Sequence, residues 1–376
     1  MRVTSFRFEP DLIGEFAEFG RTVYLDDPRR IPPFRRTLAR QLSPAYPFYN
    51  RPGNDHRHFL VHRGSEVVGR ASAMVNAAMR DQDGTPVGLV GFFECVQDPV
   101  VTNVLLDAAC GWLRAEHGLQ RIWGPVNFDI WHNYRFMTRG FDEEPFFGEP
   151  TNKPWYPEYF AGYGFRCRQT WNTIEVRGRS QLEALVAHGR APYEAALERG
   201  YRFVSGEHWD RRGDMPLLHH LVSRAFEDFL GFTPIAFEDF DRLYRRQWTM
   251  LAKPMSFFMF DPDERPMGFA VTFYELSAAI RAMRGRENPV SQARFMIGRR
   301  HVQRLNLFAA GGIPEALGTG AGLGRAGLFY VVDEALQNGF DDVIFALMAT
   351  DKRVQRLFSR DVPEAQREYA LYELRY

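Results

Sequence analysis

The two halves of this chain repeat one order of strands and helices, and that repetition strongly limits the folds open to it. Each half reads as a strand, helices, an antiparallel hairpin, a buried central strand, a helix, a strand, a helix and a final strand. No repeat is evident residue by residue, and 376 residues suit two domains. The pattern predicts an α+β fold with a mixed α/β sheet, built twice over residues 1–178 and 200–376, with a helical connector over 179–199.

In each half, the sequence predicts the strands and helices that come before and after the central strand. In the first half, alternating apolar residues predict a hairpin over 57–76 and a buried strand over 87–96. A helix follows Asp98 and stops at Gly118, where a glycine commonly ends a helix. The second half is expected to hold, in order, a hairpin over 256–275, a helical insert over 276–300, a central strand over 302–311, a helix over 322–339, a strand over 341–348 and a final strand over 367–376.

Composition argues against several classes of protein. Basic and acidic residues balance at 47 each, so the net charge gives no reason to expect a nucleic-acid partner. Cys95, Cys110 and Cys167 form no C-x-x-C pair, and no His or Cys pair has the spacing of metal ligands. Neither a secretion leader nor an apolar run of about 18 residues is present. We therefore expect a cytoplasmic protein that binds no metal.

A glycine-rich turn separates the predicted central strand of the second half from the helix that follows. Residues 319–324 read Thr-Gly-Ala-Gly-Leu-Gly. Glycines let main-chain N–H groups approach an anion closely, and a helix N-terminus adds about half a positive charge. The turn therefore suits a pyrophosphate, although a tight strand-to-helix turn that simply needs glycine would have the same pattern.

This turn resembles the acetyl-CoA-binding motif of the GNAT superfamily of N-acetyltransferases, usually Gln/Arg-Gly-x-Gly-Ile/Leu-Gly/Ala. Gly339 and Phe340 match the Gly-aromatic pair that ends the family's signature helix, whereas a rival register from Leu317 puts that helix end two residues out. The resemblance implies acyl-CoA or acetyl-CoA as co-substrate, with a splayed central strand that lines the pantetheine arm and polarises the thioester carbonyl. The cofactor-binding residues that it implies are Leu307, Phe308, Ala309, Gly311, Gly312, Ile313, Thr319, Gly320, Ala321, Gly322, Leu323, Gly324 and Arg325.

Two positions depart from the family's pattern. Thr319 stands where Gln or Arg is usual, and Phe358 stands where many members carry a tyrosine that protonates the departing thiolate. A thiol leaves tolerably well as thiolate, so the missing acid would cost only ~10²-fold in rate. These departures keep a non-catalytic or repurposed protein open as an alternative.

The reaction that the resemblance implies has an amine attack the thioester directly, so a base must remove a proton from the amine. Glu275, at the end of the second hairpin, and Asp351, after the strand over 341–348, are candidates by position. Asn306 is a further polar candidate. For carboxylates at such positions, a solvated or helix-capping role is the more common alternative.

The first half has no glycine turn after its central strand. Pro99 and β-branched residues stand there instead, so we expect no pyrophosphate in this half. Residues 124–165 are dense in polar and aromatic side chains, which indicates a shaped surface or plain loop packing. The polar side chains singled out in this half are Glu94, Asp98, Asn127, His132 and Asp142.

Strings along nearly the whole chain, among them GFFECVQD, GPVNF and MGFAVTFYELSAAIRAMRG, resemble bacterial tandem GNAT proteins. That group is mostly labelled N-acyltransferase, and bacterial ceramide synthases are associated with it. The resemblance implies a small-molecule or lipid amine acceptor, such as a sphingoid base, and allows a peripheral membrane contact. The 33 phenylalanines and the insert over 276–300 suit a long chain, although the insert could be a lid, an interface or packing. An aminoacyl-tRNA-dependent transferase is the further alternative, and the balanced charge argues against it.

Overall fold

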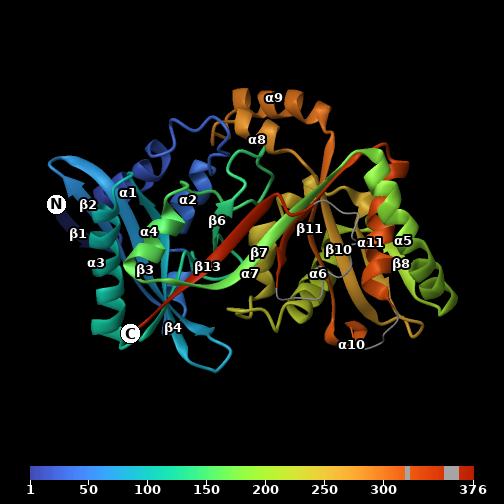
Figure 1. Ribbon diagram of the computed structural model, residues 1–376, viewed down its shortest axis with the longest axis horizontal. Coiled ribbons are helices and arrows are strands. Elements are labelled where there is room, and N and C mark those ends of the chain that lie inside the picture. The colour runs from blue at the N-terminus through green and yellow to red at the C-terminus, as the bar shows by residue number, and fades with distance from the viewer. Residues whose placement is uncertain (318–321, 351–363) are drawn as a thin grey trace.

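A computed structural model describes residues 1–317, 322–350 and 364–376 (Figure 1). The first half contains β1 (Arg2–Phe6), α1 (Pro10–Thr22), α2 (Arg35–Gln41), β2 (Asp55–Arg63), β3 (Glu66–Arg80), β4 (Pro86–Cys95), α3 (Pro99–His117), β5 (Arg121–Gly124), β6 (Phe136–Arg139), α4 (Tyr156–Tyr163) and β7 (Arg166–Arg177). The second half contains α5 (Arg179–Glu198), β8 (Arg202–Ser205), α6 (Arg211–Ala225), α7 (Phe237–Tyr244), β9 (Phe257–Phe260), β10 (Pro266–Tyr274), α8 (Ser277–Ala282), α9 (Pro289–Gly298), β11 (Arg304–Gly312), α10 (Pro314–Leu317), α11 (Leu323–Gln337), β12 (Asp342–Ala349) and β13 (Arg367–Arg375).

The strands of the described ranges form one mixed sheet that runs through both halves. It has 13 strands in the order β1-β2-β3-β4-β5-β13-β7-β12-β11-β10-β9-β8, with β6 beside β13. Most neighbours are antiparallel, but β4 pairs with β5 and β11 pairs with β12 in parallel. Each half therefore carries one parallel pair at the same point in its order of elements. The predicted α+β fold with a mixed sheet and a repeated unit is confirmed.

Exchanged strands join the two halves. The last strand, β13, lies between β5 and β7, with Tyr372 opposite Gly124 and Tyr369 opposite Trp171. β7 also pairs with β12 of the second half, where Glu175 faces Ile344. In Figure 1 the red β13 and the green β7 run together across the middle of the molecule. Strand pairing thus crosses the division at 179–199 in both directions, and that division stays a prediction about the chain.

Helix α3 begins and ends where the sequence predicted. The side chain of Asp98 accepts a hydrogen bond of 2.9 Å from the main-chain N–H of Val100, which caps the helix start. Gly118 adopts the left-handed φ of 64°, which ends the helix. The buried stripe of α3, including Leu105 and Leu113, packs in the core between the helix and the sheet.

In the second half, α5 and α11 pack closely against each other beside the sheet. A Cβ atom on Gly189 of α5 would stand 2.7 Å from the Cβ atom of Phe329 on α11, so only glycine permits this approach. Gly327 of α11 faces the ring of Phe257 on the sheet in the same way, at 2.9 Å. This packing holds α11 against α5 and the sheet.

Candidate functional site

β11 and β12 lie side by side only over the first part of each strand. Their parallel pairing runs from Arg304 opposite Asp342 to Leu307 opposite Phe345. Beyond Leu307, β11 continues beside β10 with a bulge at Phe308, and among the described residues no strand pairs with its other edge there. Alternate main-chain amides of this stretch therefore face the opening between β11 and β12.

The residues predicted to line the pantetheine arm remain attached to β10. Ala309 faces Val271, Gly311 faces Phe269 and Gly312 faces Gly268. The N–H group of Ile313 donates to the carbonyl oxygen of Met267 at 3.0 Å. Because β10 holds this strand, its free edge is a rigid wall rather than a loose segment.

The glycine turn is described only in part. α11 starts at Leu323, directly after Gly322, whose φ of 70° lies in the left-handed region. Gly322, Gly324 and Arg325 are exposed. The first N–H groups of a helix have no partner within the helix, so an anion could reach those of Leu323 and Gly324. The remaining turn residues, Thr319, Gly320 and Ala321, lie outside the described residues.

The two described catalytic candidates both hold one loop of the first half. The carboxylate of Glu275 accepts hydrogen bonds from the main-chain N–H groups of Phe147, at 2.9 Å, and Ser277, at 2.7 Å. The side chain of Asn306 donates to the carbonyl oxygen of Phe147 at 3.0 Å. Burial raises the pKa of Glu275. Through these contacts Glu275 and Asn306 hold the loop at Phe147. Asp351, like Phe358, lies outside the described residues.

The corresponding opening in the first half is closed. β4 and β5 pair only at Gly88 opposite Ile122 and Leu89 opposite Trp123. Beyond them, the N–H group of Val126 donates to the carbonyl oxygen of Val90 at 2.9 Å. The N–H group of Phe92 donates to Oδ1 of Asn127 at 2.7 Å. The chain itself thus occupies the place of a ligand arm between these strands. The carboxylate of Asp98 caps the start of α3, where it would repel an anion.

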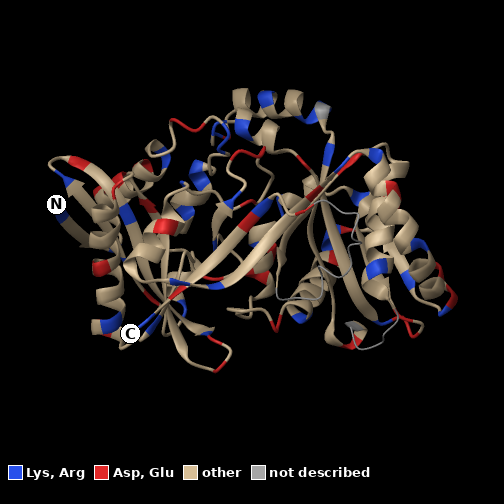
Figure 2. Cartoon of the chain, viewed as in Figure 1, with Lys and Arg blue, Asp and Glu red and all other residues tan. Residues whose placement is uncertain are grey.

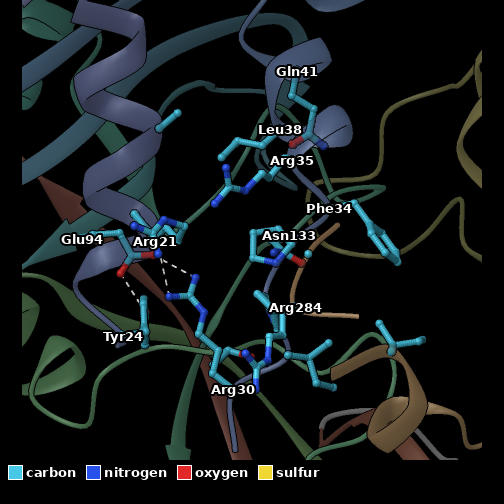
Figure 3. A pocket seen from close by; sticks show the side chains of 18 of the residues that line it. Arg21, Tyr24, Arg30, Phe34, Arg35, Leu38, Gln41, Glu94, Asn133 and Arg284 are labelled. Atoms are coloured by element: carbon cyan, nitrogen blue, oxygen red, sulfur yellow. Dashed lines mark hydrogen bonds and ion pairs between the residues drawn. The ribbon is translucent and has the colours of Figure 1, made fainter. Parts of the chain in front are cut away.

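A large cavity lies between the halves (Figure 3). Its volume is 1470 Å³, and its walls come from residues 10–42, the end of β4, the loop over 146–152 and the insert with α8 and α9. Glu94 lines one side, where it accepts hydrogen bonds from Tyr24 at 2.7 Å and Tyr156 at 2.9 Å. Figure 3 shows Arg35 and Phe34 on the opposite side of the cavity.

The polar residues singled out in the first half do not form one site. Glu94 and Asn127 line the large cavity. His132 lies elsewhere, with its ring nitrogens 2.6 Å from Asp129 and 2.6 Å from the hydroxyl of Tyr46. Asp98 caps α3, and Asp142 is exposed on a loop.

Sequence reasoning missed Glu149, which also lines the cavity. Burial raises the pKa of Glu149 to about 7, although the nearby charge of Arg367 opposes the shift. The hydroxyl of Tyr369 donates to Glu149 at 2.5 Å. A carboxyl group that titrates near neutral pH is suited to proton transfer. Only its place in the acidic run over 142–149 could have drawn attention to it.

No group of three or more His, Cys, Asp or Glu side chains within the described residues could hold a metal ion. None of their helices has the length and apolar character needed to cross a membrane.

The fold of this chain is similar to that of solved GNAT proteins. A solved tandem GNAT protein from the clavulanic acid biosynthesis pathway superimposes with a TM-score of 0.51 at 12% identity, covering 100% of this chain and 98% of that one. Protein YghO of Escherichia coli is 24% identical over 289 residues, 75% of this chain and 70% of YghO. The bacterial ceramide synthase of Caulobacter vibrioides is 24% identical over 298 residues, 76% of this chain and 73% of the synthase. No protein-family model matches the chain.

Proposed function

We propose that this protein is an acyl-CoA-dependent N-acyltransferase whose second half holds the thioester. One observation carries the proposal. The opening between β11 and β12 past Leu307 lies in the same half as α11, the helix that starts directly after the exposed Gly322. The first half, where Asn127 and Val126 close the same opening, is not proposed to bind CoA.

In the proposed reaction the chain mainly positions and polarises its substrates. The amine nitrogen attacks the thioester carbonyl carbon, the N–C bond forms, the C–S bond breaks, and the thiolate leaves as coenzyme A. A main-chain amide of β11 beyond Leu307 would donate to the carbonyl oxygen as negative charge develops on it. The N–H groups at the start of α11 would hold the diphosphate. The proton lost by the amine would pass to a carboxylate, for which Glu275 and Glu149 are the described candidates.

For the acceptor, we propose a long-chain or lipidic amine. The relative named bacterial ceramide synthase supports this choice, because a ceramide synthase forms an amide on a long-chain amine. The cavity of 1470 Å³ between the halves offers the room that such a chain needs.

A thermal-shift titration of the whole protein with coenzyme A and with palmitoyl-CoA tests the proposal. A ligand at 100 times its Kd stabilises the folded state by about 2.7 kcal/mol, so the Tm should rise by several degrees. A rise with both ligands is expected, and a larger rise with palmitoyl-CoA would support a long-chain donor. If neither ligand raises the Tm, the protein does not bind CoA and the non-catalytic alternative holds.

A further inference from the structure

The cavity between the halves carries more positive charge than its own carboxylates balance. Nine arginines line it, against the four carboxylates of Glu18, Asp27, Glu94 and Glu149. Some of these arginines are paired, such as Arg21 with Glu18 and Arg70 with Glu94. Four others make no side-chain hydrogen bond or ion pair within the described part of the chain: Arg35, Arg284, Arg286 and Arg294.

Arg135, one of the nine arginines, has a buried guanidinium with no carboxylate partner among the described residues. Its side chain lines the cavity and is 9% exposed. The guanidinium carbon lies 4.0 Å from the ring centre of Tyr134 and 4.3 Å from that of Trp171. Its Nη1 atom has no hydrogen-bond partner in the described chain. Burying a guanidinium without a carboxylate partner costs folding free energy, and an anion bound in the cavity would reduce that cost.

The cavity also exposes apolar side chains to its interior or mouth. Leu25 and Val290 line it from opposite halves of the chain and are 71% and 61% exposed. Phe34 and Leu38 contribute further apolar surface near Arg35 (Figure 3). At 1470 Å³ the cavity exceeds the roughly 300–1,000 Å³ of most small-molecule sites. These walls suit a ligand with both an anionic group and a long apolar part.

One wall of the cavity is also the support of β11. The loop over 146–148 lines the cavity, and Glu275 and Asn306 hold it from the second half. The ring centres of Phe147 and Phe308 are 6.3 Å apart. A Cβ atom on Gly148 would stand 2.8 Å from the ring of Phe308, the residue at the bulge of β11. This loop therefore lies between the cavity and the strand proposed to hold the thioester.

We propose that this cavity binds the acyl acceptor, and that the acceptor is an amphiphilic amine that also carries an anionic group, a phosphate or carboxylate, beside its alkyl chain. Guanidinium groups match both anions in planar, two-point geometry. The role as acceptor site rests on the proposed function, whereas binding of an anionic amphiphile does not.

Isothermal titration of the whole protein with dodecyl phosphate, below its micelle concentration, tests the site. We expect binding of dodecyl phosphate but not of dodecanol or dodecyltrimethylammonium, which share its chain. The double variant Arg35→Glu/Arg294→Glu should bind dodecyl phosphate about 100-fold more weakly, because both reversals face the cavity. The matched control is Arg36→Glu/Arg299→Glu, which changes the net charge equally at exposed positions outside the cavity, one on α2 and one directly after the last residue of α9.

Coenzyme A binding, measured on the same variants, separates this proposal from the proposed function. The cavity variant should bind coenzyme A as the unmodified protein does. If dodecyl phosphate does not bind, or binds equally to the cavity variant and the control, the cavity proposal is wrong even if coenzyme A binds. If dodecyl phosphate binds as expected but coenzyme A does not, the anion site stands and the acyltransferase proposal fails.

A second inference rests on a different observation, the outer surface of α9. Met296 and Ile297 on this helix are 53% and 64% exposed. Arg299 and Arg300 beside them are also exposed, and residues 288–304 contain no acidic side chain. Figure 2 shows basic but no acidic colour along α9, which stands at the rim of the molecule. Exposed apolar side chains among arginines match the headgroup region of an anionic membrane.

We infer that α9 docks the protein on an anionic membrane surface. In vesicle co-sedimentation, the protein should bind vesicles of equal phosphatidylglycerol and phosphatidylcholine but not pure phosphatidylcholine. Met296→Asp/Ile297→Asp should reduce this binding at least about tenfold. The control Val100→Asp/Leu197→Asp, at exposed apolar positions on α3 and α5, should not. Absence of binding by the unmodified protein, or equal losses in both variants, would refute the inference.

Discussion

Gly322→Glu is expected to weaken coenzyme A binding by roughly 1,000-fold in isothermal titration. A carboxylate at the start of α11 would stand within about 4 Å of the bound diphosphate, where like charges repel by about 4 kcal/mol at an effective dielectric constant of about 20. The fold should survive, because a Cβ atom at this position meets only the Cβ atom of Pro192, at 3.6 Å. The left-handed φ of 70° adds strain of about 1–2 kcal/mol for any residue other than glycine.

The matched control is Gly322→Gln, which has the same size and the same backbone strain but no charge. Its affinity for coenzyme A should fall far less than that of the glutamate variant, while the two free proteins melt at similar temperatures. Unchanged binding by Gly322→Glu would show that the diphosphate lies elsewhere. Equal losses in both variants would mean that the turn acts through its shape rather than its charge.

Local patterns predicted most helices and strands correctly. Asp98 and Gly118 marked the two ends of α3, because a capping carboxylate and a left-handed glycine act within a few residues of the helix. The start of α11 directly after Gly322 likewise follows from the glycine-rich turn. Such features depend on neighbours in the sequence, so the sequence alone is enough to place them.

Contacts between distant segments could not be predicted in this way. β13 pairs with β5 across more than 240 residues, and nothing in the alternation of its side chains distinguishes that partner from β12. The cavity arises because α2 and the insert with α8 and α9 meet, for example where the N–H of Arg35 donates to the carbonyl of Gly285 at 3.1 Å. The closing of the first-half opening depends on the side-chain amide of Asn127 and on the main chain at Val126. The sequence singled out Asn127 as polar but gave no sign of its partner.

The exchanged strand β13 also carries the most buried charge at the junction of the halves. Arg367 is 0% exposed, and its guanidinium forms ion pairs with Glu149 at 3.2 Å and Glu175 at 3.3 Å. It also donates to the carbonyl oxygen of Glu144 at 2.8 Å. Burial opposes the charge of Glu175, but Arg177 and Arg304 outweigh it and lower the pKa of Glu175. Removing Arg367 would therefore leave Glu149 with the least compensation.

Arg367→Met is expected to lower the free energy of unfolding by about 3–5 kcal/mol, measured by urea denaturation. Methionine fills much of the same space, so the loss comes mainly from carboxylates left buried without their partner. The control Arg375→Met removes an arginine from the same strand, where the side chain is 60% exposed and paired with Glu373. That substitution should cost no more than about 1 kcal/mol. If both variants lose a similar free energy of unfolding, the buried ion pairs of Arg367 contribute no more to stability than the exposed pair of Arg375.

The pH dependence of this loss identifies the carboxylate involved. In the intact protein the pKa of Glu149 is already raised to about 7, and the charge of Arg367 holds it from rising further. Without Arg367 the folded protein would keep a proton on Glu149 to higher pH, while the unfolded chain releases it near 4.5. The folded state then binds more protons between these values, so the stability of the variant falls as pH rises. Arg367→Met should therefore cost more at pH 8 than at pH 5. Adding Glu149→Gln to the Arg367→Met variant should restore part of its stability at pH 8. If stability does not recover, the loss comes from packing instead.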